Sequence, residues 1–320
     1  MDIAHFEQQL RAFQSSRILL TAIEVNLFSA IAEPSTAADA ARRLHIEPRA
    51  TELLLNAVVA LGYATKSGEV FDMHPADAEW LTDPAYRTAL LHYVHRWDTW
   101  SNLTQRVQGV APAEDFRSLP PAAHESYLAM QNLRSSRRAS TVAAALNPGN
   151  KPYRVLDLGG GTAPYSIALA QLNPLLEADI VELPELAPIT LQSIATANLT
   201  PRLRVVAGDL HDAAWPPVYD LVLLCSVAHL FGEAANRALF QRCREALAPG
   251  GRLAIHDHLL EPGKTAPRQS AIFAINMLVA TPMGATYSVE EYTEWLTAAG
   301  FGAIERVPTG NDVGLLIAHR

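Results

Sequence analysis

Cysteine, positive charge and long apolar runs are all scarce in this sequence. Only two of its 320 residues are cysteines, Cys225 and Cys243, so it offers neither a disulfide framework nor the cysteine spacing of a metal site. The formal net charge of −8 argues against a nucleic-acid or anionic-membrane partner, which would require a basic face. No apolar run approaches the roughly 18–20 residues of a membrane span, and the N-terminal segment lacks the apolar core of a signal peptide. These absences predict a soluble, cytoplasmic protein.

The first third of the chain is predicted to be helical. Apolar residues recur at three- and four-residue steps from Phe13 to Ile31, as on one face of an amphipathic helix. Residues 35–64 read as two short helices around a turn, and "TKSGEVFDMHP" (65–75) reads as a small β-hairpin. Two helices followed by a hairpin form a winged-helix pattern. We therefore expect a helical, winged-helix-like domain over residues 1–108.

Many winged helices bind DNA, so this function has to be weighed. A DNA-recognition helix presents basic and amide side chains to phosphates and base edges. Here the second helix carries mainly Arg49 and Asn56, among Glu47, Glu52 and a run of three leucines. This composition favours a buried or subunit-facing helix over DNA binding.

The rest of the chain is predicted to form a second domain of α/β type. Residues 109–125 are rich in proline and alanine and are expected to connect the two domains. From Tyr153 onward, near-continuous apolar strands such as "YRVLDLG", "ADIVEL" and "YDLVLLCSV" alternate with helix-like runs. Such strands are typical of a parallel sheet that helices cover on both faces. The sequence thus predicts a Rossmann-like domain with a mostly parallel sheet over residues 109–320.

The stretch "VLDLGGGTAPYS" (155–166) places three glycines between a strand and a helix, as in nucleotide-type sites. The dinucleotide fingerprint G-x-G-x-x-G is met by Gly159 and Gly161, but Pro164 stands in the third place. Asp157, two residues before the first glycine, is placed to meet an ammonium group, which NAD does not have. Both departures argue against a nicotinamide-dependent oxidoreductase.

Acidic residues stand at the ends of three successive predicted strands. Asp157 is in the first, and Glu182 ends the second, where an acidic side chain typically receives ribose hydroxyls. Asp209 ends the third, where a carboxylate can accept from an adenine amino group. Because α/β sheets bind ligands at the carboxyl ends of strands, these acids are expected to share one site. Amine, ribose and adenine together predict S-adenosylmethionine as the cofactor.

Several stretches resemble the plant caffeate- and acetylserotonin-type O-methyltransferases and their bacterial relatives. They are "VLDLGGGTAPYS", "VELPELAP", "VVAGDLHD", "CSVAHLFGEAANRALFQRCREALAPGGRLAIHDHLL" and "GATYSVEEYTEWLTAAGF". The N-terminal stretch "AFQSSRILLTAIEVNLFSAI" resembles the dimerisation domain of that family, so the resemblance covers nearly the whole chain. It implies methyl transfer from S-adenosylmethionine, a homodimer with interlocked helical domains, and a seven-stranded methyltransferase domain.

The same resemblance implies which residues bind the cofactor. By motif match, Asp157 and Gly159 fall at the methionine end, and Glu182 falls at the ribose. Asp209 and Leu210 fall at the adenine positions. The complete predicted set is Asp157, Gly159, Gly161, Glu182, Leu183, Asp209, Leu210 and Cys225.

His229 is the predicted general base. A hydroxyl acceptor is far more nucleophilic once deprotonated, and histidine is the usual base near neutral pH. His229 follows the apolar strand "LVLLCSV", and Asp257 ends the next strand, "GRLAIHD". Neighbouring strands lie about 4.8 Å apart, so this carboxylate can hold one imidazole nitrogen, which favours a base over a structural loop histidine. In the family that the sequence resembles, the catalytic histidine stands here, and a glutamate that steadies it occupies the place of Asp257.

The chain departs from the family at two acidic positions near this base. The family's His-Asp-Trp triplet reads His229-Leu230-Phe231 here, and Thr286 matches a second family glutamate. With both positions uncharged, the base has less electrostatic support. Three alternatives therefore stay open: C-methylation, N-methylation, and a non-methylating relative that keeps S-adenosylmethionine as a binding ligand.

Three further histidines are not expected to take part in the chemistry. His256 and His258 flank Asp257, and strand alternation predicts that both point to the opposite face. Adjacent strand residues cannot converge on one ion, so no metal site is predicted. His211 is expected to be a surface loop residue.

The acceptor pocket is predicted to lie between the two domains. Aromatic and methionine residues at helical spacing are core residues more often than ligand contacts, but Asn276 is a polar residue in an apolar helix and needs a partner. The residues predicted to line the pocket are Trp97, Trp100, Met130, Phe273, Asn276 and Met277. Together they favour a flat, largely apolar acceptor such as a phenol or aromatic polyketide, and hence an O-methyltransferase.

Overall fold

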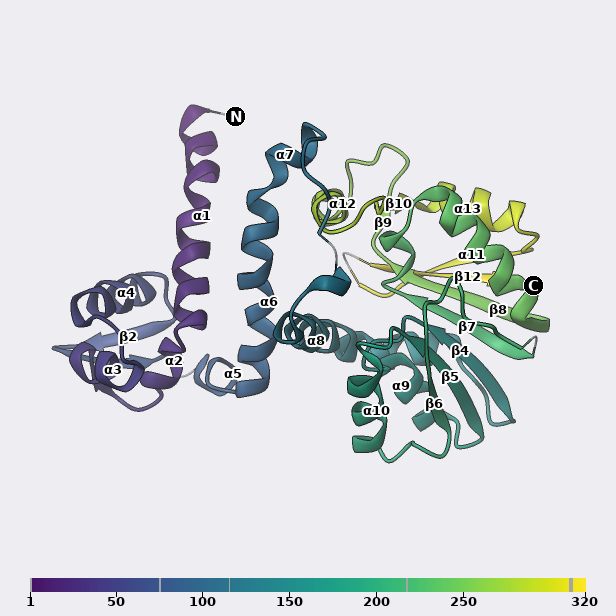
Figure 1. The fold of residues 1–320 in the computed structure, drawn as a ribbon, viewed down its shortest axis with the longest axis horizontal. Coiled ribbons are helices and arrows are strands. Elements are labelled where there is room, and N and C mark those ends of the chain that lie inside the picture. Colours follow the sequence, from purple (N-terminus) through teal and green to yellow (C-terminus); the bar gives the residue numbers. More distant parts are fainter. Residues whose placement is uncertain (1, 75, 115, 217, 311–312) are drawn as a thin grey trace. The chain divides into compact units, whose positions relative to one another are not determined.

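The computed structural model describes residues 2–74, 76–114, 116–216, 218–310 and 313–320 (Figure 1). The chain divides into two compact units. The first comprises Met1–Asp98 and Pro121–Met130, and the second comprises Thr99–Pro120 and Gln131–Arg320. The domain boundary predicted between residues 108 and 109 stays a prediction.

The first unit is mainly helical. Its elements are α1 (Ile3–Glu24), α2 (Leu27–Ala30), β1 (Ser35–Thr36), α3 (Ala37–Leu44), α4 (Pro48–Ala60), β2 (Ala64–Ser67), β3 (Val70–Met73), α5 (Ala78–Leu81) and most of α6 (Pro84–Ser101). Strands β1, β3 and β2 form a small antiparallel sheet. Two helices and a hairpin thus follow one another in the predicted order. Pro75, at the end of the predicted hairpin, lies outside the described residues.

The first helix ends earlier than its apolar periodicity predicts. Apolar residues continue to Ile31, but α1 ends at Glu24, and Asn26 has a φ of 61°. Asparagine tolerates this left-handed conformation better than most residues, so it is a natural place for the helix to break. The break lets α2 place Leu27 and Phe28 in the buried core of this unit.

The second unit is built around a seven-stranded sheet of order β11-β12-β8-β7-β4-β5-β6. Its strands are β4 (Tyr153–Leu158), β5 (Leu176–Glu182), β6 (Leu203–Ala207), β7 (Tyr219–Cys225), β8 (Leu247–Asp257), β11 (Ile304–Pro308) and β12 (Gly314–His319). The strands from β8 to β6 pair in parallel, whereas β12 and β11 are added antiparallel. The predicted, mostly parallel sheet is confirmed. The strand order reverses beside β4, and sheets of this kind bind ligands beyond the carboxyl ends of the strands at such a point.

Helices cover both faces of this sheet (Figure 1). The C-terminal part of α8 (Pro121–Leu146) packs in one core with α9 (Pro164–Leu172) and α10 (Ala187–Thr196), whereas α11 (Glu233–Ala246) and α13 (Val289–Ala298) pack in the other. The second unit also contains α12 (Arg268–Ala280) and the short α7 (Leu103–Val107), η1 (Phe116–Ser118) and η2 (Ala228–Leu230). The two-residue strands β9 (Leu259–Leu260) and β10 (Tyr287–Ser288) pair separately. No helix within the described ranges combines the length and apolar character needed to cross a membrane.

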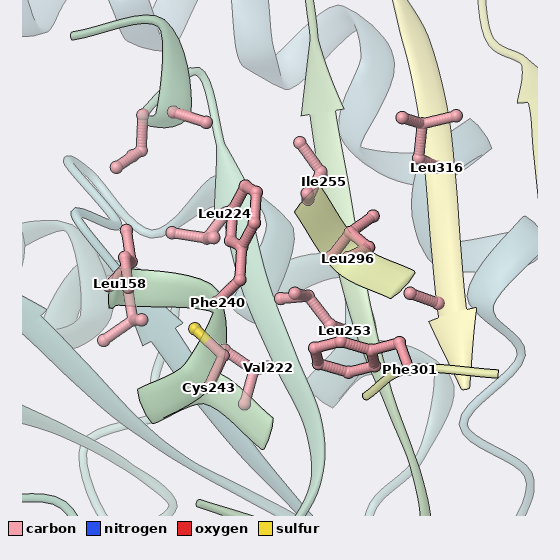
Figure 2. Close-up of a cluster of buried hydrophobic side chains, with 14 of the residues drawn as sticks. Leu158, Val222, Leu224, Phe240, Cys243, Leu253, Ile255, Leu296, Phe301 and Leu316 are labelled. Carbon is pink, nitrogen blue, oxygen red and sulfur yellow. The ribbon is translucent and has the colours of Figure 1, made fainter. Parts of the chain in front are cut away.

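Each face of the sheet has its own hydrophobic core, because successive residues of a strand point to opposite faces. Val222 of β7 packs with Phe240 of α11 and Leu296 of α13 (Figure 2). The next residue, Leu223, packs in the other core, together with Leu169 of α9. This double covering explains why the strands are apolar on both sides, and it confirms the predicted α/β fold class.

Candidate active site

The three glycines after β4 form a turn that larger residues would not fit. Gly159 has a φ of 68°, and a Cβ on it would lie 2.8 Å from a methyl carbon of Val227. A Cβ on Gly160 would lie even closer, 2.6 Å from its nearest side chain. Gly161 has a φ of 58°, and its N–H donates to Oε2 of Glu182 at 2.7 Å. The turn therefore brings the backbone after β4 against the end of β5.

Asp157 lies in β4, just before this turn, and is buried. Its Oδ2 accepts a hydrogen bond from Ser166 at 2.6 Å, whereas its Oδ1 is buried with no partner among the described residues. Burial raises the pKa of Asp157 to about 7; the bond from Ser166 opposes this rise and the charge of Glu182 adds to it. A buried acceptor without a donor is costly, and the ammonium group of S-adenosylmethionine would satisfy it. The position thus fits the predicted cofactor.

Glu182 is the last residue of β5, and backbone amides hold both of its oxygens. Oε2 accepts from Gly161 at 2.7 Å and Oε1 from Leu183 at 2.8 Å. Burial raises the pKa of Glu182, and these two hydrogen bonds oppose the rise. Each carboxylate oxygen can accept a second hydrogen bond. A fixed carboxylate with free lone pairs is suited to the hydroxyls of a ribose.

Asp209 follows β6 and is already engaged by two partners. Its Oδ1 accepts from the backbone N–H of His211 at 2.9 Å, and its Oδ2 pairs with the guanidinium of Arg117. Burial alone would raise the pKa of Asp209, but the His211 amide and the Arg117 charge outweigh burial and hold it below its usual value. Arg117 lies 92 residues earlier in the chain, and no pattern in the sequence indicated that it contacts this acid.

Two further predicted cofactor residues complete this edge of the sheet. Leu210 is half-buried, and its carbonyl accepts from Arg242 at 2.8 Å. Cys225 ends β7 and is buried. Burial, assisted by the charges of Asp157 and Asp257, raises the pKa of the Cys225 thiol well above its usual value, so the thiol stays neutral.

His229 and Asp257 meet as the sequence predicts. His229 lies in η2, directly after β7, and Asp257 ends the neighbouring strand β8; both side chains are buried. Nδ1 of His229 lies 2.5 Å from Oδ1 of Asp257, and the backbone N–H of His229 donates to Oδ2 at 3.2 Å. An ionised carboxylate only accepts hydrogen bonds, so Nδ1 carries the hydrogen, and in the neutral imidazole Nε2 keeps a free lone pair.

Asp257 stays ionised despite its burial. Burial alone would raise the pKa of its carboxyl group, but the charge and hydrogen bond of His229 outweigh burial. The His258 side chain and the backbone N–H of His258, which donates to Oδ1 at 2.7 Å, act in the same direction. The pKa of Asp257 is therefore below its ordinary value, and the group is a carboxylate at neutral pH.

The prediction for His258 is wrong. Its ring stacks on Phe273 of α12, with ring centroids 4.0 Å apart, and the same Phe273 makes a T-shaped contact with His229 at a centroid distance of 4.9 Å. Strand alternation does not extend to His258, because β8 ends at Asp257. Burial lowers the pKa of His258 to about 4, so a neutral imidazole lies against the phenyl ring that also contacts the predicted base.

His256 and His211 have the following environments. The predicted orientation of His256 away from Asp257 is confirmed, since its ring nitrogens lie 3.1 Å from Oη of Tyr165 and 3.0 Å from Oγ1 of Thr309. His211 is in a loop, but its ring is half-buried against Phe231, with centroids 4.5 Å apart. His211 is thus a loop residue, as predicted, with a side chain that is partly exposed.

The predicted acceptor residues fall in both compact units. In the second unit, Nε1 of Trp100 donates to Oδ1 of Asn276 at 3.2 Å, and Met277 is buried on the same helix. The polar partner that Asn276 needs is therefore supplied by another predicted acceptor residue. Trp97 and Met130 belong to the first unit, and their part in an acceptor site stays a prediction.

Comparison with known protein families identifies the class of this site. Residues 123–302 match the family described as the O-methyltransferase domain, over more than half of the chain. The chain belongs to this O-methyltransferase family. Family membership confirms the predicted enzyme class and S-adenosylmethionine as the cofactor of this methyltransferase. The roles of the individual residues stay predictions.

Individual relatives of the methyltransferase agree with this assignment. This chain is 30% identical over 307 residues to the 3-hydroxy-5-methyl-1-naphthoate 3-O-methyltransferase of Streptomyces sahachiroi. The match covers 91% of this chain and 87% of that protein. This chain is 39% identical over 173 residues to the L-tyrosine C(3)-methyltransferase of Streptomyces lavendulae, covering 52% of this chain and 47% of that protein. The solved structure of human N-acetylserotonin methyltransferase with S-adenosylmethionine has the same fold as this chain, with a TM-score of 0.85 and 22% sequence identity. The match covers 100% of this chain and 98% of that chain.

Proposed function

We propose that the methyltransferase transfers a methyl group to a hydroxyl of a small aromatic acceptor, with His229 as general base. The observation that carries the proposal is the 2.5 Å contact between Nδ1 of His229 and Oδ1 of Asp257, both buried, at the carboxyl ends of adjacent strands. Asp257 fixes the tautomer, so that Nε2 can take the proton of the acceptor hydroxyl. Its ionised state also stabilises the imidazolium that results.

The acids at the ends of β4, β5 and β6 are the proposed cofactor contacts. S-adenosylmethionine, when bound, supplies an electrophilic methyl group. The unpartnered Oδ1 of Asp157 would accept from its ammonium group, Glu182 would accept from its ribose, and Asp209 from its adenine. Methyl transfer is a direct displacement, so the main contribution of these residues is to hold donor and acceptor in line.

The aromatic acceptor class is supported by the surroundings of the proposed base. Phe273 of α12 presents its ring next to His229, and Asn276 on the same helix accepts a hydrogen bond from Trp100 of α6. The two named relatives act on a hydroxynaphthoate and on tyrosine, and both of these acceptors carry a phenolic hydroxyl. The test is a panel of phenols and aromatic polyketides with isotopically labelled methyl donor. Label transfer to a phenol by wild type, but not by His229→Ala, is expected; no transfer to any aromatic hydroxyl would contradict the proposal.

C-methylation is the second candidate, and the similarity to an L-tyrosine C(3)-methyltransferase favours it. A deprotonated phenol is nucleophilic at its oxygen and also at the neighbouring ring carbon, so the same base would serve both reactions. The product distinguishes them. O-methylation keeps all protons of the aromatic ring, whereas C-methylation replaces one of them. Proton NMR of the product measures this difference.

A homodimer is part of the same proposal. Ile3, Phe6, Leu10 and Phe13 lie along α1, and each side chain is more than half exposed. Their spacing of three, four and three residues is that of the a and d positions of a coiled coil. Exposed apolar stripes of this kind mark association surfaces, and a second copy of α1 is a fitting occupant.

A cytoplasmic location is also proposed. It is supported by the two free cysteines, Cys225 and Cys243, which are buried in separate cores as unpaired thiols. Proteins of reducing compartments commonly keep their cysteines in this form.

A further inference from the structure

The turn Ala228–Phe231, which carries His229, is held by hydrogen bonds to its backbone carbonyls. Nδ2 of Asn236 donates to the first and the last carbonyl of the turn, at 2.9 and 3.1 Å. The backbone N–H of Ala285 donates to the carbonyl of His229 at 3.0 Å. The hydroxyl of Tyr287 donates to the last carbonyl at 2.6 Å. Three residues from outside the turn therefore fix its path.

The turn is also enclosed by close packing. Asn236 lies in the first turns of α11 and is fully buried. On the other side, a Cβ on Gly284 would lie 2.5 Å from the carbonyl oxygen of His229. Asp257 holds the ring of His229 at one end, through Nδ1. The direction of Nε2 therefore depends on the backbone of the turn as well as on Asp257.

We infer that Asn236 is a positioning residue for His229, acting through the backbone of the turn, with Tyr287 as its auxiliary. This inference rests on the proposed role of His229 as base. A buried carboxamide that donates to two carbonyls, eight and five residues earlier in the chain, joins the start of α11 to both ends of the turn. Asparagine is a weak helix former, so its place inside a helix is consistent with a role for its side chain. Small displacements of a catalytic group can lower the rate of the chemical step by as much as about 100-fold.

The chain contains a matched control for this arrangement. Asn173 is also fully buried, and its Nδ2 also donates to two backbone carbonyls, those of Pro148 at 3.2 Å and Lys151 at 2.8 Å. It follows α9 and precedes the first residue of β5, at the edge of the sheet opposite to the carboxyl ends that carry the site. Replacing either asparagine removes two hydrogen bonds donated to backbone carbonyls, and replacing Asn173 also removes the one that it accepts from the N–H of Leu175 at 2.9 Å. Of the two, Asn236 contacts the turn of His229.

The experiment compares Asn236→Ala with Asn173→Ala in the full-length protein. In Asn236→Ala, kcat is expected to fall about 10- to 100-fold while affinity for S-adenosylmethionine stays within about twofold. Asn173→Ala is expected to lose a similar amount of stability in urea, with kcat within about twofold of wild type. Equal losses of kcat in both variants, or a wild-type kcat in Asn236→Ala, would overturn the inference.

A spectroscopic readout separates positioning from general structural damage. The Nδ1 proton shared between His229 and Asp257 should give a strongly deshielded proton resonance, identified by its loss in His229→Ala. It is expected to shift or broaden in Asn236→Ala and to stay unchanged in Asn173→Ala. If His229→Ala keeps full activity, the proposed function fails, and this resonance still reports whether Asn236 positions the ring.

A second pair of variants keeps the inference testable if Asn236→Ala does not fold. Tyr287→Phe removes only the hydroxyl that donates to the turn and retains the ring. Its control is Tyr219→Phe, which removes a hydroxyl that donates to Asp179 at 2.8 Å, at the start of β7 and thus at the opposite edge of the sheet. A loss of kcat of about twofold to tenfold in Tyr287→Phe alone is expected. No difference between the two would contradict a positioning role for the turn's hydrogen bonds.

Discussion

Nδ1 of His229 lies 2.5 Å from Oδ1 of Asp257, although 28 residues separate them in the chain. The contact follows from the sheet. Strands β7 and β8 pair in parallel, with Cys225 opposite His256. His229, which follows β7, and Asp257, which ends β8, therefore lie at the same edge of the sheet. Both side chains are buried, which excludes water from the hydrogen bond and strengthens it.

Replacing His229 by alanine tests the base. We expect the chemical step to slow by roughly 10²–10⁴-fold, because the acceptor hydroxyl would keep its proton. The affinity for S-adenosylmethionine, measured by calorimetry, should barely change, because the imidazole is assigned to the acceptor. Wild-type turnover on the true acceptor would make His229 structural.

Asp257→Asn should reduce turnover less than His229→Ala does. The carboxamide has nearly the same shape, but it can donate as well as accept, so it no longer enforces the hydrogen on Nδ1. We expect a loss of about tenfold or more in kcat with an unchanged cofactor affinity. Asp179→Asn is a suitable control, because Asp179 is also a buried acid that accepts from a side chain, yet lies near the start of β7. Equal activity of Asp257→Asn and wild type would remove the orienting role.

The pKa of Asp157, raised to about 7 by burial, predicts pH-dependent cofactor binding. Below about pH 7 the carboxyl group of the cofactor-free protein is protonated and cannot attract an ammonium group, so affinity should fall as the pH falls. Asp157→Asn should bind S-adenosylmethionine roughly ten- to a hundredfold more weakly at higher pH, and its affinity should lose this pH dependence. Calorimetry on both sides of neutrality is the measurement. A pH dependence that persists unchanged in the variant would assign it to another group.

The same group should also affect stability. The folded protein binds the Asp157 proton up to about pH 7, whereas an unfolded aspartate releases it near its ordinary pKa. The free energy of unfolding of the cofactor-free protein should therefore fall as the pH rises between these two values, by an amount on the order of 4 kcal/mol. Urea unfolding of Asp157→Asn should show a flatter dependence over this range. A slope equal to that of wild type would mean that the carboxyl group is already ionised.

Glu182→Gln tests the ribose site. A carboxamide has only one acceptor oxygen, so one of the two amides of Gly161 and Leu183 would lose its partner. We expect the affinity for S-adenosylmethionine to fall roughly tenfold or more, through both the turn and the ribose contact. Glu177→Gln, an exposed position on the same strand, is the control and should bind normally. Normal binding by Glu182→Gln would move the ribose elsewhere.

Most of the second unit could be predicted from the sequence, because local patterns determine it. The strands of this unit are almost continuously apolar, which predicted a parallel sheet with helices on both faces. The three consecutive glycines predicted a turn with positive φ or close backbone approach, as found at Gly159 and Gly161. The pairing of His229 with Asp257 was predicted from their places at the ends of successive strands, together with the histidine and glutamate that the resembled family has at these places. In both cases the prediction concerns only the edge of the sheet at which a residue lies, and this edge follows from the order and direction of the strands.

Contacts made by irregular segments could not be predicted. Arg117 reaches Asp209 from a segment without periodicity, so nothing in the sequence specifies its partner. His258 follows the last residue of a strand, where alternation no longer applies, and its ring packs on Phe273 instead. The end of α1 was also missed, because the apolar pattern continues past the left-handed residue Asn26 that breaks the helix.

Charge placed on the exposed stripe of α1 tests the dimer. Phe6→Glu with Phe13→Glu would bring two carboxylates from each copy into an apolar helix–helix contact, where unpaired charges are strongly disfavoured. Sedimentation should show a dimer for wild type and a dissociation constant raised at least about a hundredfold for the double variant. The control is Gln8→Glu with Ser15→Glu, which adds the same charge on the opposite side of the heptad and should leave the dimer intact. Both variants keep the buried core of the first unit, since the four exchanged side chains are exposed, so loss of the dimer could not be attributed to unfolding. A monomeric wild type, or a dimer that survives the Phe6 and Phe13 exchanges, would show that α1 is not the association surface.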